Sequence, residues 1–161
     1  MNSKNISGQY IHYGVREHGM AAIMNGIAAT KIYKTYSGTF LSFADYMKPS
    51  LRLAALMKID PIQVFTHDSI GLGEDGPTHQ PIEQINMLRL IPNSYVFRPC
   101  DLKETIVCWK EALKIDNAPS FICLSRQNLP QISNKKLVSK NFKGAYVCLL
   151  YTSPSPRDGQ I

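Results

Sequence analysis

The chain has 161 residues, of which 44% are hydrophobic and 19% charged, and it carries a net charge of +6. This composition is typical of one soluble globular domain, and no apolar run is long enough to cross a bilayer. The N-terminus lacks an apolar signal region, so we expect a cytoplasmic protein without a membrane partner. The basic residues form no block before Lys135-Lys136. With no nucleic-acid-binding motif present, anionic small substrates account for the positive charge, and we expect no nucleic-acid partner.

The first part of the chain predicts two helices and two extended segments. Small and apolar residues at helical spacing predict a helix over residues 15–29, and a short extended run follows over 31–36. Residues 40–57 predict a long amphipathic helix that is interrupted by Pro49. A strand is expected over 59–65, where β-branched and aromatic residues are concentrated.

A polar stretch over residues 66–81 separates this part from a second alternating pattern. That pattern predicts a helix at 82–90, a strand at 95–97, a helix at 102–115 and a strand at 120–124. The alternation predicts an α/β fold of three layers, with helices on both faces of a mostly parallel sheet. The polar stretch then lies on a strand-to-helix loop, at the sheet edge where such folds bind ligands.

The polar stretch, THDSIGLGEDGPTHQP, contains two histidines, three acids and three glycines, and almost nothing that could fill a core. Its glycines permit positive φ angles and close backbone approach, so His67, Asp75 and His79 can converge on one small volume. The simpler alternative is that each histidine is a structural group and that the aspartate belongs to a turn.

A cation site in the same stretch is a second alternative, because carboxylates and backbone carbonyls suit hard metals. The spacing matches neither the calcium-binding loop nor a zinc site, so we expect no metal ligands in this chain. The cysteines also lack the spacing of a zinc site or a redox pair, and we expect free thiols in a reducing compartment. They are Cys100, Cys108, Cys123 and Cys148.

Two further segments flank the same predicted sheet edge. Glu17 lies in the first turn of the first predicted helix, where it either complements the helix dipole or pairs with a ring nitrogen of a cofactor. Phe40, Phe43 and Tyr46 fall three apart on one face of the second predicted helix. Such a stripe usually packs in the core, but aromatic residues at a sheet edge can instead form the wall of a pocket for a flat ring.

Five segments together resemble the pyrimidine-binding middle domain of the transketolase family, in that family's order and approximate spacing. They are YIHYGVREHGM at 10–20, SGTFLSFADY at 37–46, THDSIGLGEDGPTHQP at 66–81, RPCD at 98–101 and LSRQNLP at 124–130. Other thiamine-diphosphate enzymes, such as 1-deoxyxylulose-5-phosphate synthase, share this layout but are not similar across the polar stretch. The resemblance implies a transferase that moves a two-carbon ketol unit between ketose and aldose phosphates, in the pentose phosphate pathway or the Calvin cycle.

The resemblance also implies roles for the candidate residues, with thiamine diphosphate and Mg²⁺ as cofactors. Glu17 matches a glutamate that hydrogen-bonds the aminopyrimidine ring nitrogen of the cofactor. The three aromatic residues match the pocket that holds this ring, with Phe43 stacked on it. His79 matches a histidine beside the cofactor and the first hydroxyls of the donor sugar, so the implied catalytic residues are Glu17 and His79.

For the substrate, the resemblance implies that Asp75 contacts a hydroxyl of the sugar and that His67 and Arg126 bind its phosphate. The planar guanidinium of Arg126 suits two parallel hydrogen bonds to phosphate oxygens. Arg52 and Arg98 are expected to be structural or solvated.

The resemblance finally implies that the intact enzyme has a domain to which no part of this sequence is similar. In this family an earlier domain binds the diphosphate through Mg²⁺, and the active site forms between that domain of one subunit and the pyrimidine-binding domain of the other. We therefore expect a homodimer in the intact enzyme and no activity from this chain alone. We expect the pyrimidine-binding domain over residues 1–147, with a truncated start and a linker from about 131, and a non-native or disordered tail over 148–161. A different thiamine-diphosphate enzyme and a non-catalytic partner module remain as alternatives.

Overall fold

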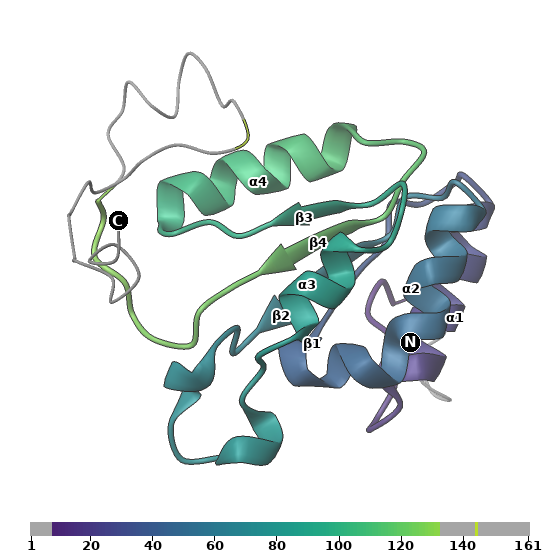
Figure 1. Ribbon diagram of the computed structural model, residues 1–161. Coiled ribbons are helices and arrows are strands. Elements are labelled where there is room, and N and C mark those ends of the chain that lie inside the picture. The colour runs from purple at the N-terminus through teal and green to yellow at the C-terminus, as the bar shows by residue number, and fades with distance from the viewer. Residues whose placement is uncertain (1–7, 133–143, 145–161) are drawn as a thin grey trace, which may run out of the picture.

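A computed structural model describes residues 8–132 and Gly144. Four strands form one parallel sheet in the order β1-β2-β4-β3 (Figure 1). The strands are β1 Tyr36–Phe40, β2 Ile62–Thr66, β3 Tyr95–Phe97 and β4 Ser120–Cys123. The predicted parallel sheet is therefore confirmed.

Helices cover both faces of the sheet, which confirms the three predicted layers (Figure 1). The helices on one face are α1 Glu17–Ala29, α2 Ala44–Leu56 and α3 Gln84–Arg89, and α4 Leu102–Lys114 covers the other face. Three short 3₁₀ turns complete the fold, namely η1 Leu41–Phe43, η2 Ile70–Leu72 and η3 Pro77–His79. Within the described part of the chain, no helix is both long and apolar enough to span a bilayer.

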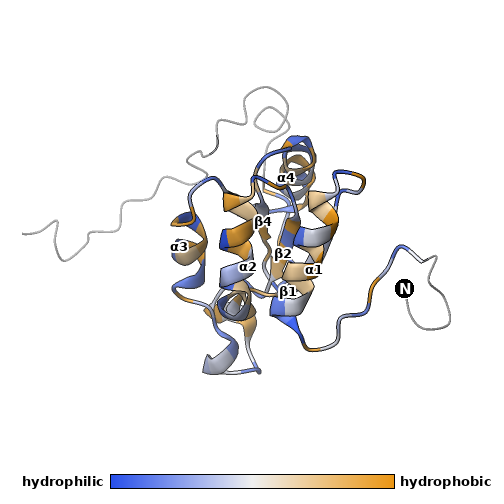
Figure 2. Cartoon of the chain, turned by 90° about the vertical axis from the view of Figure 1, so that its right-hand side faces the viewer, coloured by the Kyte–Doolittle hydropathy of each residue, from blue (hydrophilic) through white to orange (hydrophobic). Residues whose placement is uncertain are grey.

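Alternating side chains of the strands build a core on each face of the sheet. Phe65 of β2 and Phe121 of β4 are fully buried against α1, α2 and α3, with their ring centroids 6.3 Å apart. Ile62 and Ile122, from the same two strands, pack on the opposite face against Ala112 of α4. Figure 2 shows hydrophobic residues on these strands and on the helices that flank them.

The first strand lies further along the chain than predicted. Residues 31–36 were expected to be extended, but Lys31 forms a turn with φ 58° and β1 begins only at Tyr36. The strand contains Ser37 and Gly38, which have low intrinsic strand propensity, and it is held by parallel pairing of Gly38 with Val64 of β2. Tertiary pairing therefore overrides the local preference of the 31–36 segment.

The second helix also differs from its prediction. Phe40 is extended, with ψ 148°, so the helix predicted from residue 40 begins at Ala44 after the turn η1. The expectation that Phe40, Phe43 and Tyr46 share one helix face is therefore wrong, because they come from β1, η1 and α2. The expected interruption at Pro49 is also wrong, since α2 continues through it.

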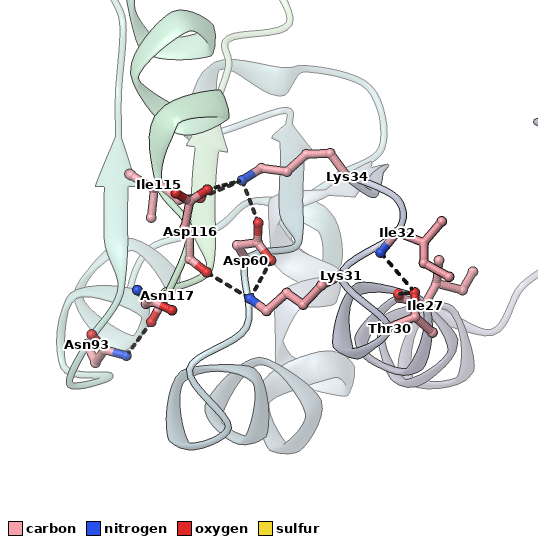
Figure 3. A network of polar contacts seen from close by, with 10 residues as sticks. All are labelled: Ile27, Thr30, Lys31, Ile32, Lys34, Asp60, Asn93, Ile115, Asp116 and Asn117. Carbon is pink, nitrogen blue, oxygen red and sulfur yellow. Dashed lines mark hydrogen bonds and ion pairs between the residues drawn. The ribbon is translucent and has the colours of Figure 1, made fainter.

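At the amino ends of the strands, a polar network ties three connecting segments together (Figure 3). Lys34 Nζ donates to the Asp60 carboxylate and to the Ile115 carbonyl oxygen. Lys31 Nζ donates to Asp60 Oδ1 at 3.4 Å and to the Asp116 carbonyl oxygen at 2.9 Å. Burial by itself would raise the pKa of Asp60, but the hydrogen bond and charge of Lys34, followed by those of Lys31, hold the pKa below its ordinary value of 3.8.

Candidate active site

The carboxyl ends of the parallel strands bring the predicted site residues to one edge of the sheet. Phe40 ends β1 and His67 directly follows β2, while Arg126 lies in the loop after β4. Glu17 opens α1, which runs alongside α2 in the same direction. His18 Nδ1 lies 3.3 Å from Ser50 Oγ in the middle of α2, and Ala28 packs with Ala54 near the ends of both helices. Glu17 therefore lies at the same edge of the sheet.

Phe40, Phe43 and Tyr46 form an aromatic wall at this edge. The rings of Phe40 and Phe43 are nearly parallel, with centroids 5.8 Å apart and an interplanar angle of 6°. The Tyr46 ring follows at 6.1 Å from Phe43, and its residue is 65% exposed. The core is filled instead by Leu41 and Ala44, both 0% exposed. Core packing therefore does not account for the three aromatic rings.

Both histidines of the polar stretch lie against the aromatic wall. The His67 ring stacks on Phe40 with a centroid distance of 3.6 Å and an angle of 21°. The His79 ring meets Phe43 edge-on, at 5.3 Å and 75°. The predicted convergence of these two histidines thus occurs on the aromatic wall, although they are twelve positions apart in the sequence.

Each histidine is also held by the threonine that precedes it. His67 Nδ1 lies 2.9 Å from Thr66 Oγ1, and His79 Nδ1 lies 2.8 Å from Thr78 Oγ1. With Nδ1 engaged in this way, Nε2 is the nitrogen left to meet a ligand. The two threonines were not predicted from the sequence, although the repeated Thr-His dipeptide is a visible signal.

The polar stretch is folded by its own short-range hydrogen bonds. Ser69 Oγ accepts from the backbone nitrogen of Gly71 and caps η2, and Gln80 Nε2 donates to the Ile70 carbonyl oxygen at 3.2 Å. At the exit of the stretch, Gln84 Nε2 donates to Asp45 Oδ2 in the first turn of α2, at 2.9 Å. This last bond fixes the stretch beside the segment that carries the aromatic wall.

The glycines act as predicted at two positions and differently at the third. Gly73 and Gly76 adopt φ angles of 93° and 78°, which side-chain-bearing residues rarely adopt. Gly71 has no positive φ, but a Cβ there would lie 3.1 Å from Gln127 Nε2. This close approach packs the loop that carries Arg126 against the polar stretch.

The remaining predicted residues are less constrained. Asp75 is exposed, and within residues 8–132 it makes no hydrogen bond or ion pair. Arg126 is likewise exposed, as is Arg52. The half-buried carboxylate of Glu17 has no hydrogen-bond or ion-pair partner among residues 8–132, which leaves it available to a ligand.

No three His, Cys, Asp or Glu side chains gather into a metal-binding group among the described residues. Of the cysteines, Cys108 and Cys123 are free thiols in the buried interior, and Cys100 is half-buried, in agreement with the expected burial. Cys148 and the predicted tail lie outside the described residues. The fold and the aromatic wall together define an α/β domain whose candidate site suits a flat, polar ring.

Comparison with known proteins identifies the family to which such a domain belongs. Residues 1–131 match the family model of the transketolase pyrimidine binding domain. Transketolase 1 of Aliivibrio fischeri is 54% identical over 148 residues, which cover 91% of this chain and 22% of that relative. This chain therefore belongs to the transketolase family, and it spans about a fifth of the length of the curated relatives it matches.

Solved structures agree with this assignment. Transketolase from Pichia stipitis in complex with sedoheptulose-7-phosphate aligns with a TM-score of 0.78 at 53% identity, over 83% of this chain and 20% of that one. A split-gene transketolase, solved as an inactive β4 tetramer, aligns with a TM-score of 0.65 at 27% identity, over 75% of this chain and 38% of that one.

Proposed function

We propose that this chain forms the pyrimidine-binding half of a transketolase active site, in which a two-carbon ketol unit passes from a ketose phosphate to an aldose phosphate. The observation that carries the proposal is the aromatic wall with two threonine-held histidines packed on it. The reported relatives, all named transketolase, support it, and one of them binds sedoheptulose-7-phosphate.

The described residues fit the aminopyrimidine ring of thiamine diphosphate. Phe40 and Phe43 offer nearly parallel rings for a flat ligand, and Glu17 offers a carboxylate without another partner among residues 8–132. Ser42 lies between the two phenylalanines in the sequence, and its hydroxyl is buried without a hydrogen-bond partner among residues 8–132. When bound, thiamine diphosphate supplies the chemistry that breaks and forms the carbon–carbon bond.

The chain's own residues would bind the aminopyrimidine ring and the donor sugar and would orient them. The Glu17 carboxylate accepts a hydrogen bond from a ring nitrogen only when that nitrogen carries a proton, so it favours the protonated ring. The aromatic wall, led by Phe43, holds the ring plane and excludes water from it. His79 offers Nε2 to the cofactor and to the donor hydroxyls close to the reacting carbon.

On the substrate side, we assign the phosphate to His67 and Arg126. The histidine offers Nε2 and the arginine offers a planar fork that matches two phosphate oxygens. Asp75 is assigned to a hydroxyl of the sugar, and its exposure leaves it free to meet a ligand. The negative charge of a sugar phosphate is consistent with the chain's net charge of +6.

The residues described do not fit the other half of the cofactor. A diphosphate bound through Mg²⁺ needs hard oxygen ligands, and no group of three candidate ligands lies among the described residues. We therefore assign the diphosphate and Mg²⁺ to a diphosphate-binding domain of a partner subunit. We further propose a cytoplasmic homodimer that acts in the pentose phosphate pathway or the Calvin cycle. The chain by itself is proposed to be inactive, as the separate β4 tetramer of the split-gene relative is.

Reconstitution tests the proposal directly. The chain is combined with a separately expressed diphosphate-binding domain of a transketolase, thiamine diphosphate and Mg²⁺, and ketol transfer from xylulose 5-phosphate to ribose 5-phosphate is measured. We expect activity that Glu17→Ala removes. Glu111→Gln alters an exposed carboxylate on α4 and serves as the matched control, for which we expect full activity. Folded chain without activity in every such mixture would contradict the proposal.

The same assay separates the alternatives. The relatives reported above do not favour another thiamine-diphosphate enzyme, and a preference for pyruvate with glyceraldehyde 3-phosphate over pentose phosphates would revive that alternative. A non-catalytic partner module would bind the diphosphate-binding domain without raising its affinity for thiamine diphosphate, which calorimetry measures.

A further inference from the structure

We propose that Arg98 and Asp68 form a positioning pair that holds His67 in its ligand-facing conformation. The role of His67 in phosphate binding rests on the function proposed above, whereas the pair itself rests on the structure. Neither Arg98 nor Asp68 is among the site residues that the sequence predicted, and Arg98 was expected to be structural or solvated.

The pair crosses the end of the central strand β4. Arg98 directly follows β3, and Asp68 lies two residues beyond β2, with β4 between them in the sheet (Figure 1). Arg98 Nε donates to Asp68 Oδ2 at 3.0 Å. Cys123, the last residue of β4, lies close to both groups. Its pKa is raised to about 12, first by burial and then by the charge of Asp68, while the charges of Arg98 and Arg89 oppose the rise.

Because the Asp68 carboxylate is buried, it needs the contact with Arg98. The Asp68 side chain is only 5% exposed and Arg98 is its hydrogen-bond and ion-pair partner among residues 8–132, while the Arg98 side chain is 49% exposed. A buried carboxylate requires a partner, because an unpaired charge away from water is strongly unfavourable. The position of Asp68 is therefore set by Arg98, which in turn fixes the backbone next to it.

His67 depends on this fixed backbone. Its φ of 58° lies in the left-handed region, which side-chain-bearing residues seldom adopt and which persists only where the surroundings enforce it. The ring is held by Thr66 Oγ1 and by its stack on Phe40. Asp68 holds the chain on the other side of His67. Without the pair, the backbone can relax to a negative φ, which turns the ring away from Phe40.

A purely electrostatic role makes a different prediction. If the two charges acted on a bound phosphate, removing Arg98 would weaken phosphate binding and removing Asp68 would strengthen it. A positioning pair predicts the same direction for both changes, and it predicts that the double change costs no more than the larger single one, because either change already breaks the contact.

Nuclear magnetic resonance on the chain itself tests the geometry. The ring protons of His67 should show an upfield ring-current shift from Phe40, assigned by its loss in Phe40→Leu. We expect Asp68→Leu and Arg98→Met, which remove the acceptor and the donor of the contact, each to abolish this shift, and Arg98→Lys to retain part of it. Asp68→Leu leaves no buried charge unpaired, because the Arg98 side chain is 49% exposed, so a folded protein is expected for the decisive variant. An unchanged His67 shift in folded Asp68→Leu would overturn the proposal.

Kinetics of the reconstituted enzyme test whether the pair affects substrate binding. We expect each of Asp68→Leu and Arg98→Met to raise KM for xylulose 5-phosphate roughly tenfold with kcat changed much less, since a displaced binding group weakens substrate binding. Opposite signs for the two variants, or additive effects, would refute a positioning role. If wild-type mixtures have no activity, the proposed function fails, while the resonance shifts still decide whether the pair positions His67.

Discussion

Replacing Asp60 with asparagine tests the polar network at the amino ends of the strands (Figure 3). The Asp60 side chain is 12% exposed and accepts hydrogen bonds from Lys34, which is 25% exposed, and from Lys31, which is 51% exposed. Asp60→Asn keeps the shape and one acceptor oxygen but removes the charge. The expected effect is therefore the loss of the charge assistance in two hydrogen bonds, one of them largely shielded from water.

The magnitude follows from that shielding. Hydrogen bonds to charged groups contribute about 1.5–3 kcal/mol, and exposed ion pairs contribute about 0.2–1 kcal/mol. The asparagine amide oxygen would still accept a hydrogen bond from Lys34, so part of the first contribution is retained. We expect the free energy of unfolding to fall by about 1–2 kcal/mol at pH 7. For a chain of this length, that corresponds to a decrease in Tm of roughly 3–6 °C.

The pH dependence gives the sharper test. Because the pKa of folded Asp60 is lowered, its stabilising contribution is fully present above the unfolded value near 3.8 and is lost as the pH falls through the folded pKa below that value. Urea unfolding of the wild type and Asp60→Asn should therefore differ at pH 7 and converge below pH 3.8.

An exposed ion pair provides the control. Glu111→Gln removes the charge that pairs with Lys114, whose side chain is 68% exposed, and should cost less than about 0.5 kcal/mol. A loss in Asp60→Asn that stays constant from pH 7 to pH 3 would refute the reasoning, because the cause would then be packing rather than charge.

Two further predictions concern the site and the thiols. Thr78→Val removes the hydroxyl that engages His79 Nδ1 and should lower kcat/KM of the reconstituted enzyme about three- to tenfold. Thr78→Ser keeps a hydroxyl and should retain most of the wild-type kcat/KM. Equal activity in both variants would contradict the role of the hydroxyl. The pKa of Cys108 is raised to about 12 by burial and then by the charge of Glu104, and that of Cys123 is also about 12. Peptide mapping after treatment with a thiol reagent at pH 8 should find both unlabelled in the folded chain and labelled in urea, and rapid labelling without urea would show that they are accessible.

Elements with local signals were predicted well. The strand at 95–97 and the start of the helix at residue 102 agree with the structure. At the start of α4, Asp101 caps the helix by accepting from the Glu104 backbone nitrogen, and Glu104 accepts in return from the backbone nitrogen of Cys100. This reciprocal cap is encoded within five residues, so no distant contact is needed to define it.

Elements defined by distant partners were predicted less well. Residues 31–36 have the apolar and β-branched character of a strand, but β1 lies at Tyr36–Phe40, where pairing with β2 selects it. The spacing of three between Phe40, Phe43 and Tyr46 suggested one helix face, whereas a strand end and a 3₁₀ turn carry the first two. Periodicity cannot distinguish these arrangements, because the register of a parallel strand is set by a segment far away in the sequence.

The sequence by itself determined the layered α/β architecture, the family and the types of residue at the site. It did so through the alternation of apolar patterns and through the polar stretch, both of which are local properties of the chain. Only the tertiary structure decided that His67 stacks on Phe40, that threonine hydroxyls engage both histidines, and that Asp68 is buried beside Arg98. These contacts arise because parallel strands bring their carboxyl ends to one edge of the sheet, where residues from separate loops meet.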